Sequence, residues 1–181
     1  MMTYLKYKTL LESKNLSLNI RMRLFNVYIT SIFFYNSELW TVTKSLENEI
    51  DVFQRNLLRK ILKIRYPYTI SNVDLYERTK ETQWSKKLKT RRLSWNGHLL
   101  RLAENTPAHK ALNEAKNKCK IYKRSSRKNW IHVVNEDFES LNVGVSMEDV
   151  EARNRALDRE WWRNKVVATS LAVYKWTCSS Q

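Results

Sequence analysis

Apolar side chains recur at helical spacing along most of this chain and predict an all-α protein. The clearest example is the stretch 84–102, whose apolar positions repeat every three, four or seven residues: Trp84, Leu88, Trp95, Leu99 and Leu102. This is the spacing of one face of an α-helix buried against a core. Only two Gly and two Pro occur in 181 residues, so turn signals are scarce, which also favours helices.

A second stripe on the same helix carries mainly positive charge. This stripe follows the same spacing, displaced by three residues toward the C-terminus, and comprises Lys87, Arg91, Ser94, His98 and Arg101. A shift of three residues rotates them by about 60°, so a helix packed on a core could still offer cations sideways. Arg92 falls where the apolar stripe should continue, and a buried guanidinium needs a carboxylate, a carbonyl or a phosphate. Gly97 within the helix predicts close approach of another backbone, for which a nucleic-acid strand is one candidate.

Similar patterns predict further helices. Ser17 is a candidate cap for a helix with inward positions at Ile20, Leu24, Val27, Tyr28, Ile32 and Tyr35. The helix after Ser45 has its apolar stripe at Leu46, Ile50, Phe53, Leu57, Ile61 and Ile64 and should stop before Pro67. Further helices are expected to begin at Ser71, Thr106-Pro107, Trp130 and Ser146. In the last of these, Val150, Leu157, Trp161 and Ala168 are expected to face Trp130 and Phe138.

The positive charge is concentrated in the middle of the chain. The formal net charge is +15, and residues 51–130 hold 21 Lys or Arg against six Asp or Glu, so this segment accounts for all of it. Such a distribution attracts polyanions, with nucleic acid as the first candidate and an anionic membrane as the second. Two distant Cys residues indicate a reducing compartment. Without a signal peptide or a spanning apolar run, we expect an intracellular location, nuclear or cytoplasmic, and no membrane partner.

The sequence lacks the motifs typical of catalytic and metal-binding sites. The sequence has no Gly-rich phosphate loop, no His-Glu-x-x-His motif and no paired Cys/His spacing for zinc. The acidic pairs, such as Glu136-Asp137, fit helix caps and solvated faces. Because a polymerase or a nuclease that uses two Mg²⁺ ions needs clustered carboxylates, we expect no cofactor, no metal and no catalysis.

Four blocks of the chain match, in order, motifs that occur together in one protein family. Residues 33–43 include Asn36, Glu38 and Trp40 of a block that usually reads Leu-Leu-Tyr-Gly-x-Glu-x-Trp-x-x-Thr, with Asn36 in place of the glycine. Residues 53–64 are similar to Phe-x-x-x-Cys-Leu-Arg-x-Ile-Leu-x-Ile. Residues 91–101 match Arg-Arg-Leu-x-Trp-x-Gly-His-x-x-Arg, the most specific block, and residues 156–163 are similar to the family's closing motif around Trp162-Arg163. Together these blocks resemble the segment after the polymerase core of non-LTR (LINE-like) retrotransposon endonuclease-reverse transcriptases.

The resemblance implies a fragment of an RNA-directed DNA polymerase without its palm or its endonuclease. It implies a thumb-like helical bundle over 1–66, followed by a basic helical region over 67–128. The seven Lys or Arg among residues 116–128 predict a mobile connector there, and the apolar stripes of the last two helices predict a C-terminal helical hairpin over 129–181. In the parent enzymes this part grips template RNA or the template–primer duplex. The residues expected to contact nucleic acid are Lys87, Arg91, Arg92, His98, Arg101, Arg59, Lys63, Lys123, Arg124 and Arg127.

A protein–protein interaction module is the alternative prediction. In that case Trp84, Trp95 and Trp130 would dock a partner protein, and the positive charge would only provide solubility.

Overall fold

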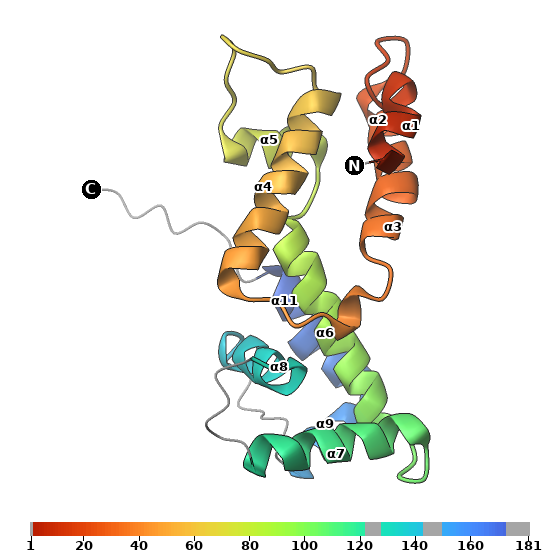
Figure 1. The fold of residues 1–181 in the computed structure, drawn as a ribbon, viewed down its shortest axis with the longest axis vertical. Helices are drawn as coiled ribbons and strands as arrows, with labels where there is room; N and C mark the ends of the chain where they lie inside the picture. Colours follow the sequence, from red (N-terminus) through yellow and green to blue (C-terminus); the bar gives the residue numbers. More distant parts are fainter. Residues whose placement is uncertain (1, 122–127, 143–149, 173–181) are drawn as a thin grey trace, which may run out of the picture. The chain divides into compact units, whose positions relative to one another are not determined.

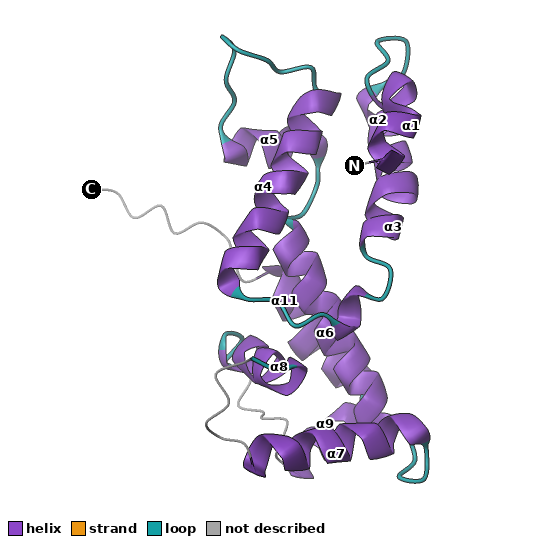
Figure 2. Ribbon diagram, viewed as in Figure 1, coloured by secondary structure: helices purple, strands orange, loops and turns teal. Residues whose placement is uncertain are grey.

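The described part of the chain is helical throughout. The computed structural model describes residues 2–121, 128–142 and 150–172, and over these ranges it contains helices and loops but no strand (Figures 1 and 2). The prediction of an all-α protein is therefore confirmed.

The helices form two compact units, which differ from the three predicted segments. One unit comprises residues 1–37 and 44–85, and the other comprises 38–43 and 86–181. The predicted boundary after residue 66 falls inside the first unit, because helix α5 (Asn72–Thr79) packs against α4 (Lys44–Ile61) and α2 (Leu18–Leu24). Residues 116–121, predicted as part of a mobile connector, lie in helix α7 (Pro107–Ile121).

The first unit is organised around an aromatic cluster. Besides α2, α4 and α5 it contains α1 (Met2–Leu11), the π-helical turn η1 (Phe25–Thr30), α3 (Ser31–Phe33) and the first two residues of α6 (Trp84–Arg101). Trp84 has no exposed surface, and its ring centroid lies 4.2 Å from that of Phe33 and 5.5 Å from that of Phe34. Phe25 and Phe53 complete the cluster at about 6 Å.

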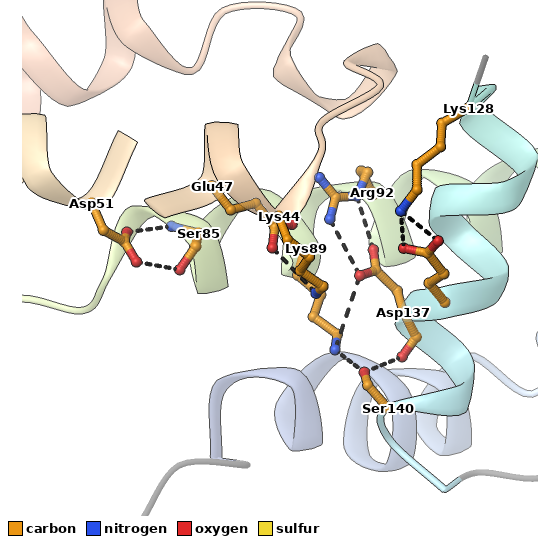
Figure 3. Close-up of polar contacts among 10 residues, drawn as sticks. Lys44, Glu47, Asp51, Ser85, Lys89, Arg92, Lys128, Asp137 and Ser140 are labelled. Carbon is orange, nitrogen blue, oxygen red and sulfur yellow. Dashed lines mark hydrogen bonds and ion pairs between the residues drawn. The ribbon is translucent and has the colours of Figure 1, made fainter. Parts of the chain in front are cut away.

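Two polar side chains of α4 satisfy the start of α6. Asp51 Oδ1 accepts a hydrogen bond from the backbone N–H of Ser85 at 2.9 Å, and Oδ2 accepts one from its hydroxyl at 2.7 Å (Figure 3). Gln54 Oε1 accepts from the backbone N–H of Trp84 at 2.9 Å. The first N–H groups of a helix have no hydrogen-bond partner within the helix, so these side chains satisfy them. The negative charge of Asp51 also interacts favourably with the positive end of the helix dipole.

The helix over 18–33 turns a different face inward from the one predicted. Ile20, Val27, Ile32 and Tyr35 are exposed, whereas Met22, Phe25 and Ile29 are buried. The prediction was wrong because this segment is apolar on more than one face, and periodicity alone does not select the face that meets α1 and the aromatic cluster.

Helix α4 follows its prediction more closely. Ile50, Leu57 and Ile61 are buried, although Leu46 is exposed, and Ser45 lies inside the helix, which begins at Lys44. The predicted caps Ser17 and Ser71 are confirmed, since their side chains accept hydrogen bonds from the backbone N–H groups of Ile20 and Asp74.

The second unit packs several short helices around α6. These are α7, α8 (Trp130–Glu139), α9 (Val150–Leu157), α10 (Arg159–Trp161), the π-helical turn η3 (Trp162–Val167) and α11 (Ala168–Ala172), together with residues 38–43. Its core contains Leu93, Leu99, Leu100, Leu112, Ile131, Val134, Phe138, Leu141, Ala152, Ala156, Trp162 and Val166. The unit therefore buries one continuous apolar cluster.

The C-terminal helix also differs from its prediction. It is interrupted at Asp158, whose backbone is extended and whose side chain accepts a hydrogen bond from the backbone N–H of Trp161 at 2.9 Å. This cap changes the phase of the helix, so that Trp162 is buried and Leu157 is 62% exposed.

Gly97 permits the close approach of an indole rather than of another backbone. A Cβ atom on Gly97 would lie 2.3 Å from Nε1 of Trp162. That indole is 3% exposed, donates a hydrogen bond to the carbonyl of Leu93 at 3.0 Å and packs edge-on against Phe138. The indole is therefore held from two sides, and it cannot move away from an added Cβ atom without losing these contacts.

Gly97→Ala should therefore destabilise the protein, contrary to the usual effect in a helix. Alanine normally stabilises a helix interior by about 0.5–1 kcal/mol relative to glycine. Here overpacking against Trp162 should cost about 1–3 kcal/mol. Chemical denaturation should show a lower midpoint for Gly97→Ala and almost no change for Ser94→Ala, which lies exposed on the same helix. A stabilised Gly97→Ala variant would contradict the packing.

Candidate nucleic-acid interface

One face of α6 carries an open pocket. The pocket has a volume of about 340 Å³ and is lined by Glu38, Arg91, Ser94, Trp95 and His98. Arg91, Ser94 and His98 are exposed, while Trp95 is half-buried and packs on the core of the second unit. Three members of the predicted cationic stripe therefore lie at one site, beside a tryptophan from the predicted apolar stripe.

Glu38 is brought to the pocket by the segment 38–43, which α6 and α8 hold. Trp130 Nε1 donates a hydrogen bond to the carbonyl of Glu38 at 2.7 Å. Arg91 Nη2 lies 3.3 Å from Glu38 Oε2, and the two side chains are 47% and 25% exposed. Because a charge-assisted contact is usually about 2.7–2.9 Å, this pair is loose and both groups remain accessible.

Trp95 and His98 form the aromatic part of the pocket. Their ring centroids are 5.2 Å apart and the rings are inclined by 33°. Trp95 is backed by the apolar core, which fixes the position of its indole. An aromatic surface beside cationic side chains is the combination that proteins use to hold an unstacked base next to a phosphate.

Arg92, which was predicted to contact nucleic acid, does not belong to this surface. Its side chain has no exposed area. Nε donates to Asp137 Oδ2 at 2.8 Å and Nη2 to Asp137 Oδ1 at 3.2 Å (Figure 3). Lys89 Nζ also lies 3.9 Å from Asp137 Oδ1 and donates to Ser140 Oγ. The predicted need for a carboxylate is met by Asp137, so Arg92 is structural.

Arg101 and Lys87 are less accessible than Arg91. Arg101 is half-buried and its Nη1 donates to the carbonyl of Ala156 at 3.1 Å. Burial, and to a lesser extent the charge of Arg159, lowers the pKa of the Arg101 guanidinium. Lys87 is also half-buried. These two cations therefore lie at the margin of the exposed stripe.

The remaining predicted contacts are not part of this site. Arg59 and Lys63 lie in the first unit, where Arg59 Nη2 donates to Asn72 Oδ1 at 2.7 Å and Lys63 is exposed with a positive φ of 59°. Lys123, Arg124 and Arg127 lie outside the described residues.

The predicted site lacked Glu38, and the predicted packing lacked Asp137 and Trp162. Glu38 was visible only as a residue of the 33–43 block, far from Arg91 in the sequence. Asp137 could have been sought as the partner that a buried Arg92 requires, although several carboxylates were available. No sequence signal identified Trp162 as the neighbour of Gly97.

Removing the partner of Arg92 should unfold the second unit at lower denaturant concentration. Asp137→Ala removes the carboxylate that two nitrogens of the buried Arg92 guanidinium contact, and breaking a buried ion pair typically costs about 3–5 kcal/mol. Glu136→Ala is the matched control, because Glu136 precedes it on α8 and pairs with Lys128 at the surface, where such a pair contributes about 1 kcal/mol or less. Combining Arg92→Met with Asp137→Leu should recover most of the loss in the free energy of unfolding. Equal effects of the two single changes would contradict this role.

Within the ranges that the structure describes, no helix is both long and apolar enough to cross a membrane. The same ranges contain no group of three or more His, Cys, Asp or Glu placed to hold a metal ion.

No protein-family model, no curated protein and no solved structure matches this chain.

Proposed function

We propose that this chain binds nucleic acid through the phosphate backbone, using the exposed face of α6, and that it carries no catalysis. In this proposal it corresponds to the thumb and C-terminal region of a non-LTR retrotransposon reverse transcriptase, a transposable-element protein. Its ligand is template RNA or a template–primer duplex. The observation that carries the proposal is the pocket on α6, where Arg91 and His98 flank Trp95 in a chain of net charge +15.

The motifs on which the resemblance rests contact one another, which supports the family assignment within this proposal. Glu38, from the block over 33–43, pairs with Arg91 from the block over 91–101. Gly97 of that second block packs on Trp162 of the closing motif. Three motifs that are distant in sequence therefore meet at α6, which is a reason for them to occur together.

Asn36 gives further support, because it departs from the family pattern in an interpretable way. Its φ is 54°, in the left-handed region. Glycine adopts this conformation without steric cost, and asparagine is among the few other residues that adopt it readily. The position therefore accounts for a glycine in the family pattern and for its replacement by asparagine here.

The alternative, a protein-docking module, loses one of its three anchors. Trp84 is completely buried in the aromatic cluster, so it has no surface for a partner. Trp130 is half-buried and its Nε1 is hydrogen-bonded to Glu38. The exposed stripe therefore favours a polyanion over an apolar protein surface.

Binding should be weakened strongly by salt, and the α6 stripe should account for part of that dependence. With roughly four to six phosphates neutralised, log K should fall with log salt at a slope of roughly −3 to −5. Lys87→Ala combined with Arg91→Ala should flatten the slope by about one to two units, less than two if Glu38 already neutralises part of the Arg91 charge. RNA titrations over a range of salt concentrations measure this.

The matched control removes the same charge from the first unit. Lys6 and Lys8 are exposed on α1, and replacing both with Ala changes the net charge equally. An identical slope change in the two double variants would mean that the stripe is only a solvated face, and it would move the protein-docking alternative ahead.

The purified chain should not extend a primer. We expect no product with a primed RNA template, dNTPs and Mg²⁺ or Mn²⁺, because two-metal polymerases need clustered carboxylates to hold the ions. Gel analysis of a labelled primer is sufficient, with a known reverse transcriptase as the positive control. Robust extension would reject the non-catalytic part of the proposal.

A further inference from the structure

The pocket on α6 offers more than charge, because Glu38 adds hydrogen-bond acceptors to a cationic and aromatic site. A carboxylate repels a phosphate, so Glu38 adds nothing to the backbone contacts that the cations of the α6 stripe would make. Glu38 is nevertheless 25% exposed and lines the pocket beside Arg91. A ligand group with both acceptors and donors would complement Arg91 and Glu38 together.

The Arg91–Glu38 pair has a defined hydrogen-bonding pattern. Arg91 Nη2 and Glu38 Oε2 lie 3.3 Å apart, so a guanidinium donor stands next to a carboxylate with two acceptor oxygens. A guanidinium has five N–H groups and can donate to a ligand while it contacts Glu38. The pair therefore presents one donor followed by two acceptors, the same order as the pairing edge of cytosine.

We propose that this pocket binds an unpaired guanine base, with Arg91 and Glu38 on its pairing edge and Trp95 against its face. Guanine presents O6 as an acceptor, followed by the donors N1–H and N2–H₂, which complement the pair in order. Arg91 would donate to O6, and the two oxygens of Glu38 would accept from N1–H and N2–H₂. This inference rests on the proposed nucleic-acid binding and adds a preference for one base.

The other bases fit the same pair less well. Uracil matches Arg91 with O4 and Glu38 with N3–H, but its O2 acceptor would face the second carboxylate oxygen. Adenine and cytosine present an amino donor where Arg91 also donates. Inosine, which lacks the N2 amino group, loses one of the three hydrogen bonds. The expected order of preference is guanine, then inosine, then uracil, with adenine and cytosine last.

The size and walls of the pocket are suited to a single base. Its volume of about 340 Å³ is near the lower end of the range for small-molecule sites, roughly 300–1,000 Å³. Trp95 supplies an aromatic surface held by the core, and His98 lies one turn further along α6 with its ring 5.2 Å away. Base stacking on an aromatic side chain does not depend on the base, so the selectivity would come from Glu38 and Arg91.

The test compares short single-stranded RNAs made of uridine, into which isolated guanosine, inosine, adenosine or cytidine residues are placed. Isolated guanosines avoid four-stranded structures. We expect the full chain to bind the guanosine RNA at least about fivefold more tightly than the all-uridine RNA, since a good bidentate base contact gives about 5- to 150-fold discrimination. Fluorescence anisotropy at fixed salt measures the affinities.

Glu38→Gln and Glu104→Gln form a matched pair of variants. Both remove one negative charge from the second unit, but Glu104 does not line the pocket, and its side chain is 74% exposed and paired with Arg153. Both variants should bind the all-uridine RNA as well as the wild type or better. Only Glu38→Gln should lose the guanine preference, because an amide places a donor where guanine also donates. Thermal unfolding verifies that both variants are folded.

The outcomes separate this inference from the proposed function. Equal affinity of the wild type for all the RNAs would overturn the guanine pocket and leave backbone binding intact, as would a guanine preference that survives Glu38→Gln. No RNA binding at all would overturn both. Guanosine monophosphate tests the source of the base: it should bind at least about tenfold more weakly than the guanosine RNA, which adds backbone contacts. Equal affinities would overturn a nucleic-acid strand as the ligand.

Discussion

One buried ion pair, Arg92 with Asp137, ties α8 to α6 in the second unit. Removing a guanidinium and a carboxylate from water costs several kcal/mol for each ion, and the cost is offset only if geometry and hydrogen bonding are good. Arg92 and Asp137 approach this condition through two nitrogen–oxygen contacts of 2.8 and 3.2 Å, with the guanidinium fully buried and the carboxylate 4% exposed. Few other registers of α8 on α6 would bring these two groups together, so the pair selects one arrangement. The apolar core by itself is less directional, because hydrophobic contacts tolerate sliding.

This arrangement determines what the opposite side of α6 can do. With Arg92, Leu93 and Leu99 turned inward, helical geometry leaves Arg91, Ser94 and His98 outward. Trp130 comes from α8, the helix that Asp137 anchors, and its indole holds the backbone of Glu38. The buried pair is therefore linked to the pocket through α8, and the position of Glu38 is a consequence of core packing. A structural pair and a candidate binding site share one helix without sharing residues.

The sequence predicted the helices better than the faces they bury. For α6 the bounds were predicted well, and Arg91, Ser94 and His98 of the cationic stripe are exposed as expected. The apolar stripe was only partly right, because Leu93 and Leu100 are buried beside it whereas Trp95 is half-buried. For the helix over 18–33 the wrong face was chosen, because Ile20 and Val27 are as apolar as Met22 and Phe25, and only tertiary contacts distinguish them. The buried face of the C-terminal helix was predicted wrongly for another reason. The break at Asp158 shifts the helical phase, and a single capping side chain of this kind is hard to foresee. The pocket was half-predicted, since its cations lie on one helix while Glu38 is more than fifty residues away.

The contacts of Gly97 and Asn36 bear on how the resemblance should be understood. Few residue types are tolerated where a helix has no room for a Cβ atom or where φ is positive. These positions therefore restrict the sequence more than exposed cations do. Gly97 is required by the indole of Trp162, and Asn36 precedes the segment that delivers Glu38. Both positions therefore act on the geometry of the same unit or of the chain leading into it. A solvated cationic face alone would need neither, because surface lysine and arginine tolerate backbone changes. The motif positions thus concern the packing of α6 against Trp162 and the backbone that leads to Glu38.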